Sequence, residues 1–198
     1  MEGAEEIRQC ILQKLDLQLN SDLGTFRIAD FGCSIGPNTF LAVQTIIDSV
    51  KVKQSKDNKE VSLMPLEFQV FFNDQPNNDF NTLFRTQLRS STHEYFSTGV
   101  PGSFYGRVLP RNSIHIGHTS YTIHWLPKVP EQCNNLVEEV TKAYKVQFTE
   151  DMKDFLEARA EEIVQGGLMI VLGQCLSDDV PMSETWQGIV VDIVTLRS

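Results

Sequence analysis

The stretch "IADFGCSIGPNT", residues 28–39, restricts the fold more than any other part of the sequence. It joins an apolar run to two glycines and a proline, and the segment "NTFLAVQTIIDSV" after it has apolar residues at helical spacing. Pro37 suits the first turn of that helix. We predict a strand, a tight turn and a helix, followed by a polar loop over residues 51–62 and a second strand at "LEFQVFFND". Such a unit implies parallel strands and a right-handed crossover.

The rest of the chain extends this alternation. Helical spacing predicts helices over residues 4–19, 79–88 and 135–164, and "NSIHIGHTS" predicts a short strand. The run "VPGSFYGRVLP" predicts a loop with turns. The nearly continuous apolar run "LMIVLGQCL" is typical of a parallel strand covered on both faces, and we expect "GIVVDIVTLRS" to begin a further helix. The prediction is an α/β, doubly wound fold in one domain over residues 1–198.

Composition excludes several classes of protein. The net charge of −9 argues against a nucleic-acid partner and against binding to an anionic membrane surface. No apolar run approaches the roughly 20 residues that cross a bilayer, and the acidic N-terminus lacks the pattern of a signal peptide. The four cysteines are spaced too irregularly for a zinc site or a disulfide framework. We therefore expect a cytoplasmic protein with reduced thiols and no metal ligands.

Ligands of open α/β sheets bind outside the carboxyl ends of the strands, where the strand order switches. The turn here reads "GCSIG" rather than GxGxxG, and no GK[ST] follows it, which excludes a P-loop. Asp74 ends the second strand and could accept hydrogen bonds from a ribose diol, or could instead cap the helix that follows. A cofactor turn and an acid without a phosphate cradle favour a nucleoside without phosphates, such as S-adenosylmethionine. Ser34 or Asn38 could hydrogen-bond its amino-acid tail.

Aromatic and polar side chains cluster after the strand at "NSIHIGHTS". Tyr121, His124 and Trp125 are interpreted either as core packing or as the wall of a small-molecule pocket. Chance and packing explain His115 and His118, because strand positions also suit half-buried histidines. The sequence contains no GxSxG, so a serine hydrolase is poorly supported.

Five long blocks occur in the order found in one plant family. They are "IADFGCSIGPNTF", "EFQVFFNDQPNNDFNTLF", "GVPGSFYGRVLP", "SIHIGHTSYTIHWLPKVP" and "AYKVQFTEDMKDFLEARAEEIVQGGLMIVL". Over about residues 26–191 the chain resembles the SABATH methyltransferases, which include carboxyl methyltransferases and caffeine-pathway N-methyltransferases. The resemblance is nearest to a branch beside the farnesoic acid methyltransferases. It implies a Rossmann-like fold that uses S-adenosylmethionine.

The resemblance implies donor-contacting positions. Cys33 and Asn38 match contacts to the donor, Asp74 matches the acid on the ribose hydroxyls, and Ser103 and Phe104 match contacts to the adenine end. The full set is Cys33, Asn38, Asp74, Gln75, Ser103 and Phe104.

The resemblance also implies an acceptor pocket at Tyr121, His124 and Trp125, with His124 and Trp125 holding a carboxylate. A carboxylic acid with a pKa of about 4 is ionised at neutral pH, so it can attack the methyl group without a general base. Alignment and exclusion of water would supply the catalysis. The expected product is the methyl ester of a small plant carboxylic acid.

The sequence also departs from the family pattern. We expect it to lack the N-terminal segment that closes over donor and substrate, a stretch between Pro130 and Cys133 whose asparagine is associated with magnesium, and most of the α-helical cap. The resemblance leaves open a magnesium ion and a homodimer. The alternative is a catalytically inactive or regulatory donor-binding paralogue that dimerises with an intact relative. A nicotinamide-dependent oxidoreductase is disfavoured because GxGxxG is absent.

Overall fold

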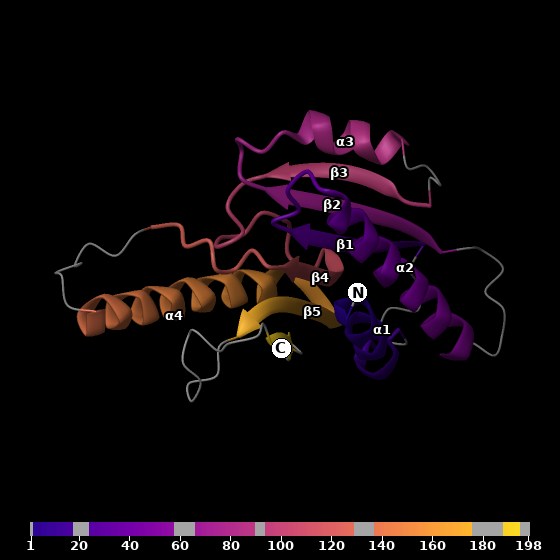
Figure 1. Cartoon of the computed structure of the whole chain (residues 1–198). Coiled ribbons are helices and arrows are strands. Elements are labelled where there is room, and N and C mark those ends of the chain that lie inside the picture. Colours follow the sequence, from indigo (N-terminus) through magenta and orange to yellow (C-terminus); the bar gives the residue numbers. More distant parts are fainter. Residues whose placement is uncertain are drawn as a thin grey trace.

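A computed structural model of the chain describes residues 2–17, 24–57, 66–89, 94–128, 137–175 and 188–194. In these ranges it forms one mixed sheet with helices on both faces (Figure 1). The elements in chain order are α1 (Glu2–Lys14), β1 (Thr25–Phe31), α2 (Pro37–Asp57), β2 (Glu67–Asp74), α3 (Phe80–Arg89), β3 (Phe96–Pro101), β4 (Ile114–Ser120), α4 (Val137–Glu162), β5 (Ile163–Cys175) and β6 (Gly188–Val194).

The strand order is β3-β2-β1-β4-β5-β6. The pairs from β3 to β5 are all parallel, and β6 runs antiparallel to β5. The prediction of a doubly wound, largely parallel α/β fold is therefore confirmed. The chain builds outward from β1 to β3, then returns to place β4 on the other side of β1. The turn after β1 and the loop after β4 consequently leave the same edge of the sheet side by side.

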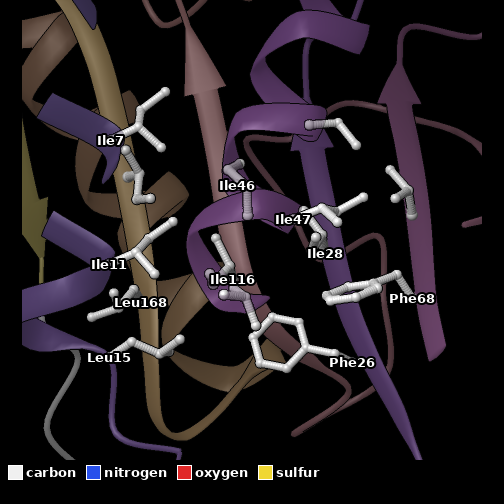
Figure 2. Close-up of a cluster of buried hydrophobic side chains, with 14 of the residues drawn as sticks. Ile7, Ile11, Leu15, Phe26, Ile28, Ile46, Ile47, Phe68, Ile116 and Leu168 are labelled. Carbon is white, nitrogen blue, oxygen red and sulfur yellow. The ribbon is translucent and has the colours of Figure 1, made fainter. Parts of the chain in front are cut away.

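Two apolar clusters hold the layers together. In the first, Ile7 and Ile11 of α1 and Ile46 of α2 pack over Ile28 of β1 and Ile116 of β4 (Figure 2). In the second, on the opposite face, α4 and the loop after β3 cover the sheet, with Ala29, Phe31, Phe104, Leu109, Phe155 and Met169 among its members. The two clusters follow from the alternation of side chains along β1, whose successive residues point to opposite faces.

Several boundaries differ from the sequence-based prediction. The predicted loop over residues 51–62 is wrong as far as residue 57, because α2 continues through it. Lys53 pairs with Asp57 one turn on, at 3.3 Å, and its ammonium donates to the carbonyl oxygen of Leu12, which supports the extra helix. Leu19, which was expected on the first helix, lies outside the described residues.

The strand content was underestimated. β3 lies in a stretch for which no strand was predicted, and α4 gives way to β5 at Ile163, before the glycines that were expected to end the helix. The final segment forms β6 instead of a helix, in keeping with its run of β-branched residues. No described helix is long and apolar enough to cross a membrane.

His115 on β4 generates a prediction about pH. Its ring is 1% exposed and stacks on Phe26, and Nδ1 accepts a hydrogen bond from the backbone N–H of Arg27 at 2.8 Å. Burial, and secondarily the charge of Arg27, lowers the pKa of His115 from 6.5 to about 4. Between these pH values the unfolded chain binds more protons, so stability falls as the pH drops through this window. This one group should remove about 2 kcal/mol of stability between pH 7 and pH 5.

His115→Gln removes that titration. Urea unfolding at the two pH values should show an acid-induced loss that is about 2 kcal/mol smaller in the variant than in the wild type. Equal losses in both proteins would mean that His115 is not neutral in the native state.

Candidate functional site

The turn after β1 is fixed by backbone contacts on two sides. The N–H groups of Gly32 and Cys33 both donate to the carbonyl oxygen of Asn73, at 2.8 and 3.0 Å. Gly32 has a φ of 77°, and a Cβ placed there would lie 2.5 Å from Cγ2 of Thr122. Only glycine fits this position, because both the conformation and the space exclude a side chain. The turn is thereby tied to the end of β2 and to the loop after β4.

Asp74 joins this turn to two other segments. Its Oδ2 accepts the N–H of Ser34 at 2.6 Å, and its Oδ1 accepts the N–H of Gln75 at 2.7 Å. Its backbone carbonyl accepts the N–H of Gly102 at 2.8 Å. The alternative role of Asp74 as a helix cap is excluded, because Asp79 caps α3 through Thr82. Each carboxylate oxygen of Asp74 keeps a lone pair for a further donor.

A cavity of about 320 Å³ opens where β1, α2 and β4 meet. Five of the candidate site residues line it: Cys33, Ser34, Asn38, Tyr121 and Trp125. The backbone at Gly36 also lines it, and a Cβ there would meet no atom within 4 Å. The remaining lining residues are Asp30, Gly32, Thr39, Ala42, His118, Ser120 and Thr122.

A buried polar group forms part of this lining and was missed by sequence reasoning. Asp30 and His118 are register partners on β1 and β4, and Oδ1 of Asp30 lies 2.7 Å from Nδ1 of His118. The hydroxyl of Thr39 donates to the other oxygen of Asp30. His118 is 1% exposed, yet its Nε2 has no hydrogen-bond partner. A buried polar atom of this kind calls for a partner, which a ligand could supply.

The loop after β4 places its aromatic side chains outward. Tyr121 has a φ of 56°, and Trp125 is 72% exposed. The rings of His124 and Trp125 lie with centroids 5.7 Å apart. Trp125 lines the cavity already described, whereas His124 lines a second hollow of about 420 Å³. That hollow lies between the loop and α4, and its other residues are Leu126, Val140, Thr141, Tyr144, Lys145 and Phe148.

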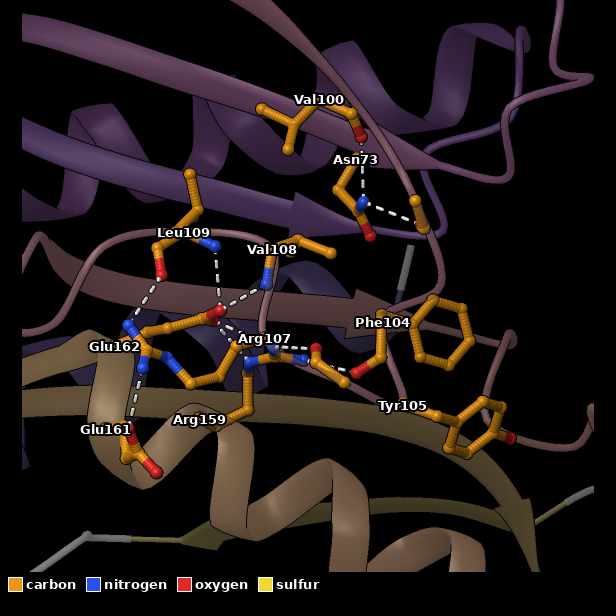
Figure 3. Close-up of polar contacts among 12 residues, drawn as sticks. Asn73, Val100, Phe104, Tyr105, Arg107, Val108, Leu109, Arg159, Glu161 and Glu162 are labelled. Carbon is orange, nitrogen blue, oxygen red and sulfur yellow. Dashed lines mark hydrogen bonds and ion pairs between the residues drawn. The ribbon is translucent and has the colours of Figure 1, made fainter.

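Ser103 and Phe104 lie in the loop after β3, outside both hollows. Ser103 is exposed, but the ring of Phe104 is only 6% exposed and packs edge-on against Phe155, with centroids 5.9 Å apart. The carbonyl oxygen of Phe104 accepts a hydrogen bond from Nη1 of the buried Arg159 at 2.7 Å (Figure 3). The loop after β3 is therefore anchored to α4.

Cys33 is not a nucleophile in this setting. Burial is the main cause that raises the pKa of its thiol, and the charges of Asp30 and Asp74 add to it. A thiol that remains protonated at neutral pH neither attacks an electrophile nor binds a metal well. Residues 130–133, where we expect the chain to lack the stretch associated with magnesium, lie outside the described residues.

Comparison with known proteins gives consistent matches. A profile described as SAM-dependent carboxyl methyltransferase matches residues 1–195. A probable S-adenosylmethionine-dependent methyltransferase of Arabidopsis thaliana is 68% identical over 207 residues, covering 97% of this chain and 58% of the relative. The farnesoic acid carboxyl-O-methyltransferase of the same plant is 47% identical over 204 residues, covering 96% and 57%. A solved loganic acid methyltransferase with S-adenosylhomocysteine matches with a TM-score of 0.80 and 46% identity, over 89% of this chain and 53% of that one.

The fold is that of the Rossmann-like class of S-adenosylmethionine-dependent methyltransferases. The chain belongs to the family of SAM-dependent carboxyl methyltransferases, and the predicted SABATH resemblance is confirmed. It spans little more than half the length of the curated relatives that it matches.

The two glycines of the turn should respond differently to alanine. Gly32→Ala should lower the free energy of unfolding by about 2–4 kcal/mol, since it combines an unfavourable φ with overpacking against Thr122. Gly36 has no positive φ and no neighbour to meet. Gly36→Ala should therefore change stability by less than about 0.5 kcal/mol. Urea unfolding of both variants measures the contrast, and equal destabilisation would contradict the geometry of the turn.

Proposed function

We propose that the chain binds S-adenosylmethionine and transfers its methyl group to the carboxylate of a small plant acid, which forms a methyl ester. The observation that carries the proposal is the glycine turn at the switch between β1 and β4, with Asp74 beside it and Trp125 across the cavity. Two relatives are named for carboxylic acids, farnesoic and loganic acid, which supports an acid acceptor. Residues 1–198 are proposed to act as one donor-binding domain.

The lining of the cavity supports the proposal of a polar ligand with a charged tail. Nε2 of His118 is buried without a partner, and the backbone at Gly36 opens onto free space. The first turn of α2 lines the cavity, and a helix N-terminus favours a carboxylate such as that of an amino-acid tail. Cys33 and Asn38 are proposed to contact this tail.

The proposed contacts to the nucleoside of the donor depend on Asp74. This residue is proposed to accept hydrogen bonds from the ribose hydroxyls, with Gln75 beside it. Ser103 and Phe104 are proposed to contact the adenine. Gln75 N–H donates to the carboxylate of Asp74, and Gly102 N–H donates to its carbonyl oxygen, so both segments are fixed to that residue. The ribose and adenine contacts would therefore be set together.

The proposed reaction depends on how the donor and the acceptor are positioned, and it requires no proton transfer by the protein. S-adenosylmethionine supplies a methyl group on a sulfonium, which is the electrophile. A carboxylic acid acceptor is already ionised at neutral pH. His124 and Trp125 line neighbouring hollows, but their ring centroids lie 5.7 Å apart, and their ring N–H groups are proposed to orient one carboxylate oxygen. Tyr121 is proposed to border the acceptor. The protonated thiol of Cys33 offers no competing nucleophile. The rate would come from alignment and exclusion of water.

Two measurements on the 198-residue chain test the proposal. Calorimetric titration with S-adenosylhomocysteine measures donor binding, and a radiolabelled methyl assay over a panel of acids measures ester formation. We expect both binding and product. Binding without any ester across the panel would overturn the enzymatic proposal and favour an inactive donor-binding protein. Absence of binding would overturn the donor site itself.

Asp74→Asn should weaken binding of S-adenosylhomocysteine by about 10–100-fold, the range expected for lost hydrogen bonds to a charged acceptor. The matched control is Asp79→Asn, which removes the same charge from an exposed cap of α3, where asparagine caps equally well. The control should leave the dissociation constant within about twofold. Equal affinities in wild type and both variants would remove Asp74 from the donor site.

Trp125→Ala should raise KM for the acid and lower kcat, since it removes a proposed carboxylate donor, while the affinity for S-adenosylhomocysteine changes by less than about threefold. An effect of about tenfold on kcat/KM is expected for a lost hydrogen bond to a charged group. Leu41→Ala is the control, because Leu41 is 66% exposed and does not line the cavity. A variant that loses donor affinity but keeps KM for the acid would move Trp125 out of the acceptor pocket.

A further inference from the structure

Two loops at the site are joined through the hydroxyl of Tyr105. We call residues 102–109 the donor loop and residues 121–126 the acceptor loop. Oη of Tyr105, in the donor loop, donates to the carbonyl oxygen of Ile123 at 2.8 Å and lies 3.3 Å from that of Trp125. One hydroxyl proton serves both acceptors, so the shorter bond to Ile123 carries most of the interaction. The two carbonyls flank His124 in the chain.

Other contacts hold the acceptor loop near its start. Tyr121 N–H donates to the carbonyl oxygen of Leu172 at 2.8 Å, which fixes the start of the loop to β5, and Ile123 packs against the second apolar cluster. Further along, the N–H groups of Trp125 and Leu126 donate to the carbonyl oxygens of Thr122 and His124, within the loop. The hydroxyl of Tyr105 adds hydrogen bonds that tie residues 123 and 125 to the donor loop.

Tyr105 is well suited to this task. Its ring is half-buried and lies against Phe104, with centroids 4.8 Å apart. Burial, and then the charge of Asp151, raises the pKa of Tyr105 to about 12. The hydroxyl therefore keeps its proton, and its donor role, throughout the neutral range.

The donor loop is itself anchored by a buried ion pair on α4 (Figure 3). Arg159 and Glu162 are both 0% exposed, and Nε of Arg159 donates to Oε2 of Glu162 at 2.8 Å. The guanidinium also donates to the carbonyl oxygens of Phe104, at 2.7 Å, and Gly106, at 2.9 Å. These two residues flank Tyr105, so Arg159 holds the backbone on either side of it.

Glu162 holds the far end of the same loop. Its Oε1 accepts the N–H groups of Val108, at 2.6 Å, and Leu109, at 2.8 Å. The guanidinium of Arg159 lies 4.1 Å from the centroid of the Phe31 ring, which covers the remaining face of the charge. A buried ion pair is destabilising unless its hydrogen-bonding groups are satisfied. Here both side chains also form hydrogen bonds with backbone groups of the donor loop.

We propose that Tyr105 is a positioning residue that holds His124 and Trp125 of the acceptor loop in place, while Arg159 and Glu162 hold the donor loop that carries Tyr105. The proposal rests on the proposed function, because it assumes that these loops bind donor and acceptor. The position of the acceptor loop then depends on Tyr105, and the position of Tyr105 depends on Arg159. Loss of Arg159 therefore disturbs both loops, whereas loss of the Tyr105 hydroxyl disturbs the acceptor loop alone.

Tyr105→Phe removes only the hydroxyl. We expect kcat/KM for the acid to fall about five- to tenfold, the scale of one hydrogen bond, with the dissociation constant of S-adenosylhomocysteine within about twofold. Arg159→Lys cannot reproduce the paired contacts to both carbonyls, so it should impair both quantities and lower the melting temperature. The control is Tyr95→Phe, which removes the hydroxyl of a half-buried tyrosine that lines neither hollow of the site and should leave the kinetics unchanged.

A second readout is independent of activity. Hydrogen exchange followed by mass spectrometry should show amides of residues 122–126 exchanging at least about fivefold faster in Tyr105→Phe than in wild type, and unchanged in Tyr95→Phe. Faster exchange with no ester formed by any protein would uphold the positioning role and overturn the proposed function. Unchanged exchange, or a donor affinity that falls in parallel with the melting temperature, would overturn the positioning role.

Discussion

The direct parallel pairing of β1 with β4 is the constraint on which the site depends. It brings the turn after β1 so close to the loop after β4 that Thr122 occupies the space of a Gly32 side chain. The hydroxyls of Thr119 and Thr122 are hydrogen-bonded to each other and lie 2.9 and 3.3 Å from the carbonyl oxygen of Phe31, the last residue of β1. The turn after β1 and the acceptor loop are therefore in direct contact at the switch point, and their positions depend on each other.

A second constraint acts from the opposite face of the sheet. The buried Arg159–Glu162 pair contributes little net stability by its charges alone, since desolvation offsets most of the attraction. The pair instead specifies the conformation of the donor loop, because it forms hydrogen bonds with four backbone groups. These are the carbonyls of residues 104 and 106 and the N–H groups of residues 108 and 109. The loop lacks regular secondary structure, and the pair replaces the ladder bonds that a strand would have had.

The sequence predicted what depends on local signals. The apolar run into "GCSIGPNT" and the helical spacing after it were enough for β1, the turn and the start of α2, and the end of β2 at Asp74 was also predicted. What it missed depends on partners distant in the chain. β6 is a strand because it pairs with β5, and Asp30 meets His118 because β1 and β4 share a register. The contacts of Arg159 span more than fifty residues, and no spacing rule connects them.

Two partly buried groups near the site keep their protons at neutral pH, which accords with a reaction that needs no general base. The Cys33 thiol and the Tyr105 hydroxyl both have raised pKa values, chiefly because they are buried. The carboxylate of Asp74 accepts the backbone N–H groups of Ser34 and Gln75, which ties the turn after β1 to the end of β2. Under the proposed function, the chemistry depends on where the segments lie, and the contacts of Gly32, Asp74 and Tyr105 determine their positions.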